Sequence, residues 1–332
     1  MLSVYAQGPT GLVSLPHEPD APLPANALWI DLLEPTAEEE KLVEDALHID
    51  VPTREEMREI EASNRFYEEQ GALFMTVTIV TKLDTDQPQN AQITFILVGE
   101  RLVTNRYSDP VSLRRFINYS QSHPASCGSA AMLLGGILEA IVNRIADVLE
   151  HLGSEIDSIS SHIFSRSRRR HSEPDDYGRM LERIGQCGEL VSKGRESLAS
   201  LARLLVFFQE VTNAATGQNV SRNVSQDART RFRTLSRDVG PMSEYATFLG
   251  DKVQFLLDAT LGMVSIDQNN ILKIFSVVTL FFLPPSVIVG FYGMNFEHIA
   301  WLHASWGPWY ALGLVIVSGL APYLYFKRRG WL

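Results

Sequence analysis

Cysteine is scarce in this sequence, because only Cys127 and Cys187 occur among its 332 residues. The two lie far apart and neither belongs to a Cys-X-X-Cys pair, which predicts buried free thiols rather than a disulfide or a zinc site. Basic residues are also too few for a general nucleic-acid binder, since 29 Lys and Arg stand against 39 Asp and Glu. The net negative charge is compatible with cations as partners, and we expect no nucleic-acid partner.

Common catalytic motifs are missing as well. The sequence contains no GxxxxGK[ST], no GxGxxG and no HExxH, and its eight histidines are dispersed. We therefore expect no enzyme and no catalytic cofactor. The N-terminus has neither a basic start nor a long apolar segment, which argues against a signal peptide and predicts a cytoplasmic N-terminal portion.

Long apolar runs occur only near the C-terminus, at residues 274–292 and 309–326. Each run is long enough to cross a bilayer core of about 30 Å at ~1.5 Å per residue. Lys273 precedes the first run and Lys327-Arg328-Arg329 follow the second, whereas the loop 293–308 has no Lys or Arg. This distribution predicts spans at 271–292 and 309–326, an external loop 293–308, and both termini, including the tail 327–332, on the cytoplasmic side of the plasma (inner) membrane.

The remaining sequence predicts an α/β domain over residues 1–125. Strands are expected at 28–33 and 72–82, with two more between 91 and 107. Thr36 and Glu39 have the spacing of a capping box that opens a helix. Thr53 and Glu56 repeat that spacing, which predicts a second acidic helix.

Helical periodicity dominates after this domain. We expect antiparallel helices over 126–216 and a long stalk helix over 217–270, which begins or kinks at Gly240-Pro241. The stalk carries a coiled-coil-like apolar stripe. Its members are Met242, Tyr245, Leu249, Val253, Leu256 and Met263. From residue 241 to 292 it would extend roughly 75 Å, which predicts packing against copies of itself.

The first apolar run carries small and weakly polar residues at steps of three and four. They are Ser276, Thr279, Leu283, Ser286 and Gly290, and Asn269 extends the row. Such a stripe has two readings, close packing of helices or the wall of a water-filled pore. Neither run contains Asp, Glu, Lys or Arg, so a pore wall of hydroxyls and carbonyls suits a hydrated ion rather than a bare one.

Gly293-Met294-Asn295 follows the first run directly, and this tripeptide can end a helix or bind an ion. The Asn295 carbonyl oxygen could accept hydrogen bonds from the water shell of a cation. Two C-terminal spans joined through this tripeptide resemble the CorA family of divalent-cation transport proteins. The resemblance implies a funnel-shaped homopentamer in the lipid bilayer, whose first span lines the pore and whose second span forms an outer ring.

The resemblance also implies roles for individual residues. Gly293, Met294 and Asn295 would form the selectivity collar, and Ser286 would be a pore hydroxyl. Leu272, Phe275 and Leu283 would form an apolar constriction, with Asn269 at the cytoplasmic mouth. Asp258 would be a regulatory metal ligand, paired with Glu56 of a neighbouring subunit.

The transported ion stays open between Mg²⁺ or Co²⁺ and Zn²⁺ or Ni²⁺. Pro284-Pro285 replaces the single proline usual in the family, and His298 and His303 in the loop could favour a softer ion. Residues 51–57 also resemble the ZntB branch, which implies proton-coupled zinc transport as an alternative. An alternative of another class is a membrane-tethered oligomeric sensor or scaffold that conducts no ion.

Overall fold

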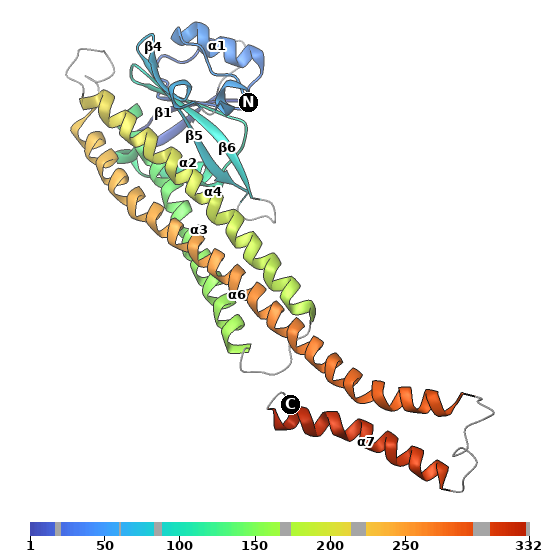
Figure 1. The fold of residues 1–332 in the computed structure, drawn as a ribbon. Coiled ribbons are helices and arrows are strands. Elements are labelled where there is room, and N and C mark those ends of the chain that lie inside the picture. The colour runs from blue at the N-terminus through green and yellow to red at the C-terminus, as the bar shows by residue number, and fades with distance from the viewer. Residues whose placement is uncertain are drawn as a thin grey trace. The chain divides into compact units, whose positions relative to one another are not determined.

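The computed structural model describes residues 1–16, 21–59, 61–82, 88–166, 174–213, 224–294 and 306–329. The chain divides into two compact units, Met1–Leu257 and Asp258–Leu332. The first unit contains a sheet and long helices, and the second contains the two apolar helices (Figure 1).

A seven-stranded sheet forms the N-terminal part of the first unit, in the order β2-β1-β3-β7-β6-β5-β4. Only β3 and β7 are parallel neighbours, with Trp29 opposite Leu102, and every other neighbouring pair is antiparallel. The strands are β1 (Leu2–Gln7), β2 (Leu12–Leu15), β3 (Trp29–Leu33), β4 (Phe66–Glu69), β5 (Ala72–Thr81), β6 (Gln89–Val98) and β7 (Arg101–Arg106). The strands expected near 28–33, 72–82 and 91–107 are therefore present, and β1, β2 and β4 are additions.

Helix α1 (Ala37–Leu47) begins at the expected capping box. Glu39 N–H donates to Thr36 Oγ1 over 3.3 Å, and Thr36 N–H donates to Glu39 Oε2 over 3.0 Å. The prediction of a second acidic helix after Thr53 is wrong. The same reciprocal hydrogen bonds form between Thr53 and Glu56, but they open only the single 3-10 turn η1 (Glu56–Arg58), because Glu59 turns to ψ 142°.

A buried ion pair holds the two parallel strands together at their carboxyl ends. Arg106 donates through Nε to Asp31 Oδ1 over 2.9 Å and through Nη2 to Asp31 Oδ2 over 2.8 Å. Thr104 Oγ1 also donates to Asp31 Oδ1, over 2.6 Å. Burial alone would lower the pKa of Arg106, but the hydrogen bonds and charges of Asp31 and Asp109 raise it. Arg106 therefore stays charged inside the sheet.

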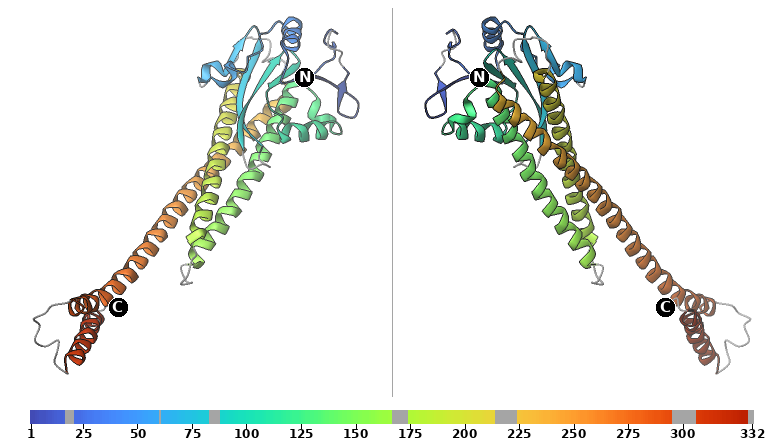
Figure 2. Two further views of the ribbon diagram at one scale, coloured as in Figure 1. Left: turned by 90° about the vertical axis from the view of Figure 1, so that its right-hand side faces the viewer. Right: turned by 90° about the vertical axis from the view of Figure 1, so that its left-hand side faces the viewer.

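Long helices follow the sheet. After α2 (Val111–Ser120), which the sequence analysis missed, come α3 (Ala130–Arg166), α4 (Pro174–Asn213) and α6 (Gln226–Tyr292). Helix α4 lies on the sheet, as the views in Figure 2 also show, and Ser200 Oγ accepts the Thr78 N–H over 3.0 Å. Both cysteines are buried and neither forms a disulfide, as predicted.

The prediction that the stalk helix begins at Gly240-Pro241 is wrong. Helix α6 begins at Gln226 and runs through both residues. Contacts ahead of Gly240 hold this first part in place, since Phe232 stacks on Phe208 of α4 with ring centroids 3.8 Å apart. Arg231 also forms an ion pair with Glu139 of α3. Packing therefore stabilises the helix across a residue pair that would favour a break.

The apolar stripe of the stalk packs largely within its own chain. Leu249 and Leu256 are buried, and a Cβ placed on Gly188 of α4 would lie 3.3 Å from Val253 Cγ1. On Gly153 of α3, a Cβ would lie 3.8 Å from Leu249 Cδ2. Helices α3 and α4 thus cover part of the stripe, whereas Tyr245 stays exposed, and packing of the stalk against other copies of the chain stays a prediction.

Candidate ion pathway

The second unit contains two helices that are long and apolar enough to cross a membrane, the C-terminal part of α6 and α7 (Gly307–Arg328). The apolar stretch of each is 0% buried inside the protein. A core helix of a soluble protein would be buried, since exposing so many large apolar side chains to water is unfavourable. The exposed surfaces therefore favour lipid or further protein as their surroundings.

One face of α6 lies against α7. The rings of Phe281 and Tyr323 lie 5.7 Å apart, and a Cβ on Gly319 would lie 3.6 Å from Pro285 Cγ and 4.0 Å from the Phe281 carbonyl oxygen. Gly319 was missed from the sequence, although the neighbouring Ser318-Gly319 forms a small-residue step in an apolar span, the usual sign of close helix packing.

The stripe of small and polar residues lies on the side of α6 that does not face α7. At 3.6 residues per turn, Ser276, Thr279 and Ser286 fall roughly opposite Phe281 and Pro285. The stripe residues Leu272, Phe275, Ser276, Thr279, Leu283, Ser286 and Gly290 are all exposed, as is Asn269. Packing against α7 in the same chain is therefore not the role of the stripe.

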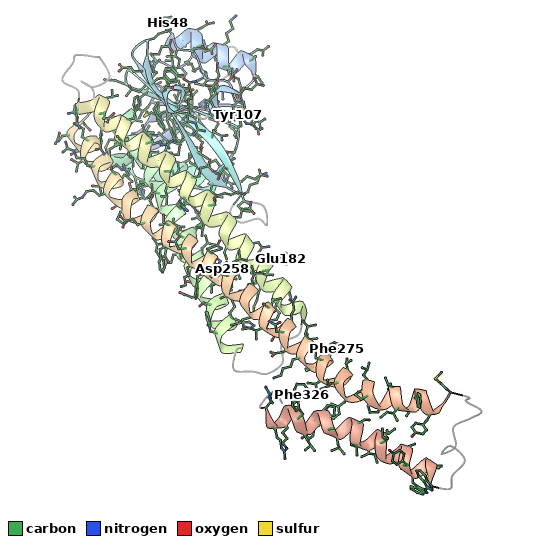
Figure 3. All side chains as sticks on the ribbon, in the orientation of Figure 1. His48, Tyr107, Glu182, Asp258, Phe275 and Phe326 are labelled. Atoms are coloured by element: carbon green, nitrogen blue, oxygen red, sulfur yellow. The ribbon has the colours of Figure 1, made fainter. Side chains whose placement is uncertain are left out.

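A shallow hollow of about 410 Å³ lies on this exposed face. The lining residues that the structure describes all belong to α6 and are Leu272, Phe275, Ser276, Thr279, Leu280, Leu283 and Pro284. Figure 3 labels Phe275, one of the residues that line the hollow. The residues expected at the constriction and at the hydroxyl lining thus share one surface.

The three hydroxyls on this face point their hydrogens back into their own helix. Ser276 donates to Leu272 O over 2.8 Å, Thr279 to Phe275 O over 2.8 Å, and Ser286 to Phe282 O over 2.6 Å. A hydroxyl whose proton is engaged in this way presents lone pairs outward. Water in the shell of a metal ion presents hydrogens outward, so the exposed face is complementary to a hydrated cation.

The proline pair removes two backbone donors from the middle of the apolar stretch. Pro284 and Pro285 lack the N–H groups that would bond the carbonyls of Leu280 and Phe281. Leu280 lines the hollow, whereas the Phe281 carbonyl lies next to Gly319 of α7. The proline pair therefore lies between the hollow and the contact with α7.

The helix ends at the expected tripeptide. Gly293 N–H donates to Val289 O over 2.9 Å and Met294 N–H donates to Phe291 O over 3.3 Å, and the Met294 side chain is exposed. Asn295 lies outside the described residues, as do His298 and His303 of the loop. Trp306 and Trp309 are described, and both are exposed.

The two residues expected to sense an ion lie on separate units. Asp258 is exposed on α6 (Figure 3), whereas Glu56 lies on η1 beside the sheet. Glu56 Oε2 accepts hydrogen bonds from Thr53 N over 2.8 Å and from Thr53 Oγ1 over 2.9 Å, so this carboxylate already has local partners. Within the described ranges, no group of three or more His, Cys, Asp or Glu side chains is arranged to hold a metal. The pairing of Asp258 with Glu56 stays a prediction.

The charge around Glu56 affects one neighbouring group. The pKa of Tyr67 rises to about 12, first because its hydroxyl is partly buried and then because Glu69, Glu56 and Asp50 are negative.

Taken together, these features define an integral membrane protein with an α/β domain, long helices and two C-terminal spans. The family model described as "CorA-like Mg2+ transporter protein" matches residues 24–328. The "Magnesium transport protein CorA" of Escherichia coli strain K12 is 32% identical over 332 residues, which is 100% of both chains. The chain therefore belongs to the CorA family, which confirms the resemblance. Because this is a family of transporters, the expectation that the chain is not an enzyme is also confirmed.

Solved structures agree on the fold. The complete CorA magnesium transporter from Methanocaldococcus jannaschii superposes with a TM-score of 0.75 at 18% identity, covering 100% of this chain and 99% of that one. The ZntB cytoplasmic domain from Vibrio parahaemolyticus superposes with a TM-score of 0.58 at 11% identity, covering 79% of this chain and 97% of that one. At these identities the likeness is one of fold alone.

Gly319 allows the two spans to approach, which gives a testable pair of substitutions. A Cβ at Gly319 would fit, but the larger side chain of Gly319→Leu would overlap Pro285 and the Phe281 backbone. We expect Gly319→Leu to destabilise the protein by about 1–3 kcal/mol and Gly319→Ala to be tolerated. The midpoint of thermal unfolding in detergent measures the effect.

Gly313 of the same helix supplies the matched control, because a Cβ there meets nothing within 4 Å. Gly313→Leu should unfold at the same temperature as the unchanged protein. Equal midpoints for the two leucine variants would show that α7 does not pack on α6 through Gly319.

Proposed function

We propose that this protein transports hydrated Mg²⁺ across the membrane through a pore lined by α6. The observation that carries the proposal is the exposed hydroxyl face of α6, whose protons are engaged internally and whose lone pairs are free to accept. One α6 cannot enclose a pore, so several copies must surround it. The family resemblance implies five, with α7 as the outer ring.

Mg²⁺ is the ion best supported among the candidates. The relative that matches over its full length is named a magnesium transport protein, whereas the ZntB likeness covers a cytoplasmic domain at 11% identity. Mg²⁺ also holds its first water shell tightly, so it suits a wall of neutral acceptors without carboxylates. Co²⁺, Zn²⁺ and Ni²⁺ remain comparison ions, and proton coupling remains the alternative mechanism.

Selection would occur at the outer mouth, where Gly293, Met294 and Asn295 repeat around the ring. The Asn295 amide oxygen would accept hydrogen bonds from coordinated water, while the backbone at Gly293 ends the helix. Farther in, Leu283, Phe275 and Leu272 would narrow the path, and Asn269 would form the inner mouth. The absence of Lys and Arg from residues 293–308 supports an external loop with both termini inside.

The first test compares ion flux into liposomes for the unchanged protein and for Asn295→Ala. We expect Mg²⁺ uptake by the unchanged protein and its loss in the variant, because the water shell then lacks its acceptor at the mouth. Parallel measurements with Co²⁺, Zn²⁺ and Ni²⁺, with and without a pH gradient, identify the ion and any proton coupling.

Mass measurement in detergent is the control for assembly, and it should give the same oligomer for both proteins. A monomer, or an oligomer that conducts none of the four ions, would favour the non-conducting scaffold. Normal flux in Asn295→Ala would show that Asn295 does not select the ion.

The hydroxyl face makes a second prediction. Thr279→Val keeps the side-chain size and the helix, but it removes the outward acceptor. One lost hydrogen bond is worth about 1 kcal/mol, so we expect Mg²⁺ flux to fall at least about fivefold. Thr279→Ser restores the hydroxyl and should conduct normally.

Ser318→Ala tests whether any hydroxyl in a span would behave in the same way. Ser318 lies on α7 and donates to Val315 O over 2.8 Å. Its removal should leave flux unchanged. Equal losses in Thr279→Val and Ser318→Ala would mean that the α6 face does not line the path.

We also propose that internal ion closes the pore through Asp258 and Glu56 of adjacent subunits. Two facing carboxylates repel one another unless a divalent cation lies between them, so ion loss would loosen the interface and favour the open state. Asp258→Lys places a permanent cation there. We expect its flux, and its protection from protease, to become insensitive to internal Mg²⁺.

Glu56→Lys is the reciprocal change and should behave alike. The unchanged protein should become more resistant to protease as Mg²⁺ is added. If neither its protease pattern nor the ion dependence of Asp258→Lys flux differs in this way, the sensing pair is refuted while the transport proposal stands.

A further inference from the structure

A cationic cluster lies at one end of the two apolar spans of the second unit. It consists of Lys273 on α6 and of Lys327, Arg328 and Arg329 at the end of α7, and all four side chains are exposed. In the part of the chain that the structure describes, none of the four forms an ion pair. Residues 268–296 and 298–332 contain no Asp or Glu. The cluster therefore lacks a carboxylate partner within the described spans.

The antiparallel course of α6 and α7 brings Lys273 to the same end as the other cations (Figure 1). The rings of Phe281 and Tyr323 mark the level at which the two helices touch. Lys273 lies eight residues ahead of Phe281, which is about 12 Å along the helix axis. Lys327 lies four residues past Tyr323, about 6 Å in the same direction. The two lysines thus differ by about 6 Å along the axis, a distance that their flexible side chains can span to reach one headgroup.

Two tyrosines hold cations of the cluster at the edge of the apolar surface. Lys327 Nζ lies 5.5 Å from the centroid of the Tyr323 ring, and Arg329 Cζ lies 5.5 Å from the centroid of the Tyr325 ring. Contact with a ring face leaves N–H donors of both cations available for an anion. Tyrosine is also typical of the boundary between acyl chains and water. The cations are therefore held at the depth of lipid headgroups.

The exposed apolar surface of α7 continues directly from the cluster. Leu320 and Leu324 are 49% and 53% exposed, and no residue of 309–326 is charged. A phospholipid has the same order of parts, because its charged headgroup is joined to acyl chains. Its phosphate can contact the cations while its chains cover the leucines. A soluble anion would leave the apolar part of this surface uncovered.

The helix dipole compensates only a small part of the positive charge. The last carbonyl groups of α7 carry the equivalent of about half a negative charge, against four cations in the cluster. A zwitterionic headgroup adds no net charge, since its ammonium group compensates its phosphate. A headgroup with net negative charge compensates the remainder, and basic residues beside a span attract such lipids.

We propose that the cationic cluster binds the headgroup of an anionic phospholipid, whose acyl chains lie along the exposed face of α7. The proposal rests on the membrane location of both helices. It is independent of which ion the protein transports and of the side of the membrane that the cluster faces. Anionic lipid is then a bound partner of the protein and not only a solvent for its spans.

Native mass spectrometry of the full-length, delipidated protein in detergent tests the proposal. The probes are phosphatidylglycerol and phosphatidylcholine with identical acyl chains, and glycerophosphoglycerol as the anionic headgroup without chains. We expect phosphatidylglycerol to bind at least about fivefold more tightly than phosphatidylcholine, because each Lys or Arg near an anionic headgroup contributes about that factor. The chainless headgroup should bind most weakly, since it lacks the contact with α7.

The double variant Lys327→Gln with Arg329→Gln should lose at least about fivefold in affinity for phosphatidylglycerol and leave phosphatidylcholine unchanged. Lys327→Arg with Arg329→Lys keeps both charges and should bind phosphatidylglycerol normally. The matched control is Lys41→Gln with Arg115→Gln, because both residues are exposed in the first unit and the change in net charge is the same. The control should keep the preference for the anionic lipid.

The thermal midpoint and the oligomer mass of each variant check that it is folded and assembled. Equal affinity of the unchanged protein for the two lipids would overturn the proposal, and so would equal losses in the two glutamine double variants. Binding of the chainless headgroup as tightly as phosphatidylglycerol would show that the ligand is a soluble anion and not a lipid. None of these outcomes depends on ion flux, so they leave the transport proposal to its own test.

Discussion

A helix in lipid has to satisfy its own backbone hydrogen bonds, since no water is present to replace a missing partner. Helix α6 breaks this requirement where Pro284 and Pro285 remove two donors. The carbonyls that lose their donors are those of Leu280 and Phe281, and Gly319 lets α7 approach the second of them. The same arrangement determines which face of α6 is left without a partner, so the candidate pathway depends on it.

The contact of α6 with α7 determines which face of α6 stays exposed. With Phe281 and Pro285 turned toward α7, the stripe through Ser276 and Thr279 is left exposed. An unpaired hydroxyl in lipid is unfavourable, but these hydroxyls donate hydrogen bonds to carbonyl oxygens of the preceding turn. The lone pairs of the hydroxyl oxygens remain without a donor. Water in an aqueous path can donate hydrogen bonds to them, whereas acyl chains cannot.

Sequence patterns were sufficient where one local rule decides the structure. The capping box at Thr36 predicted the start of α1, and alternation predicted β5 to β7, because both signals act within a few residues. The same capping signal at Thr53 failed. Its hydrogen bonds do form, yet Glu59 leaves the helical conformation and only one turn results. The predicted helix start at Gly240-Pro241 failed for the opposite reason, since distant partners such as Phe208 and Glu139 hold α6 on both α4 and α3, whereas a kink there stays a prediction.

The candidate pathway was largely predictable, because exposure, hydroxyl spacing and lack of charge are all properties of one helix. The direction of each hydroxyl proton and the role of Gly319 were not, since both depend on the conformation of the surrounding chain.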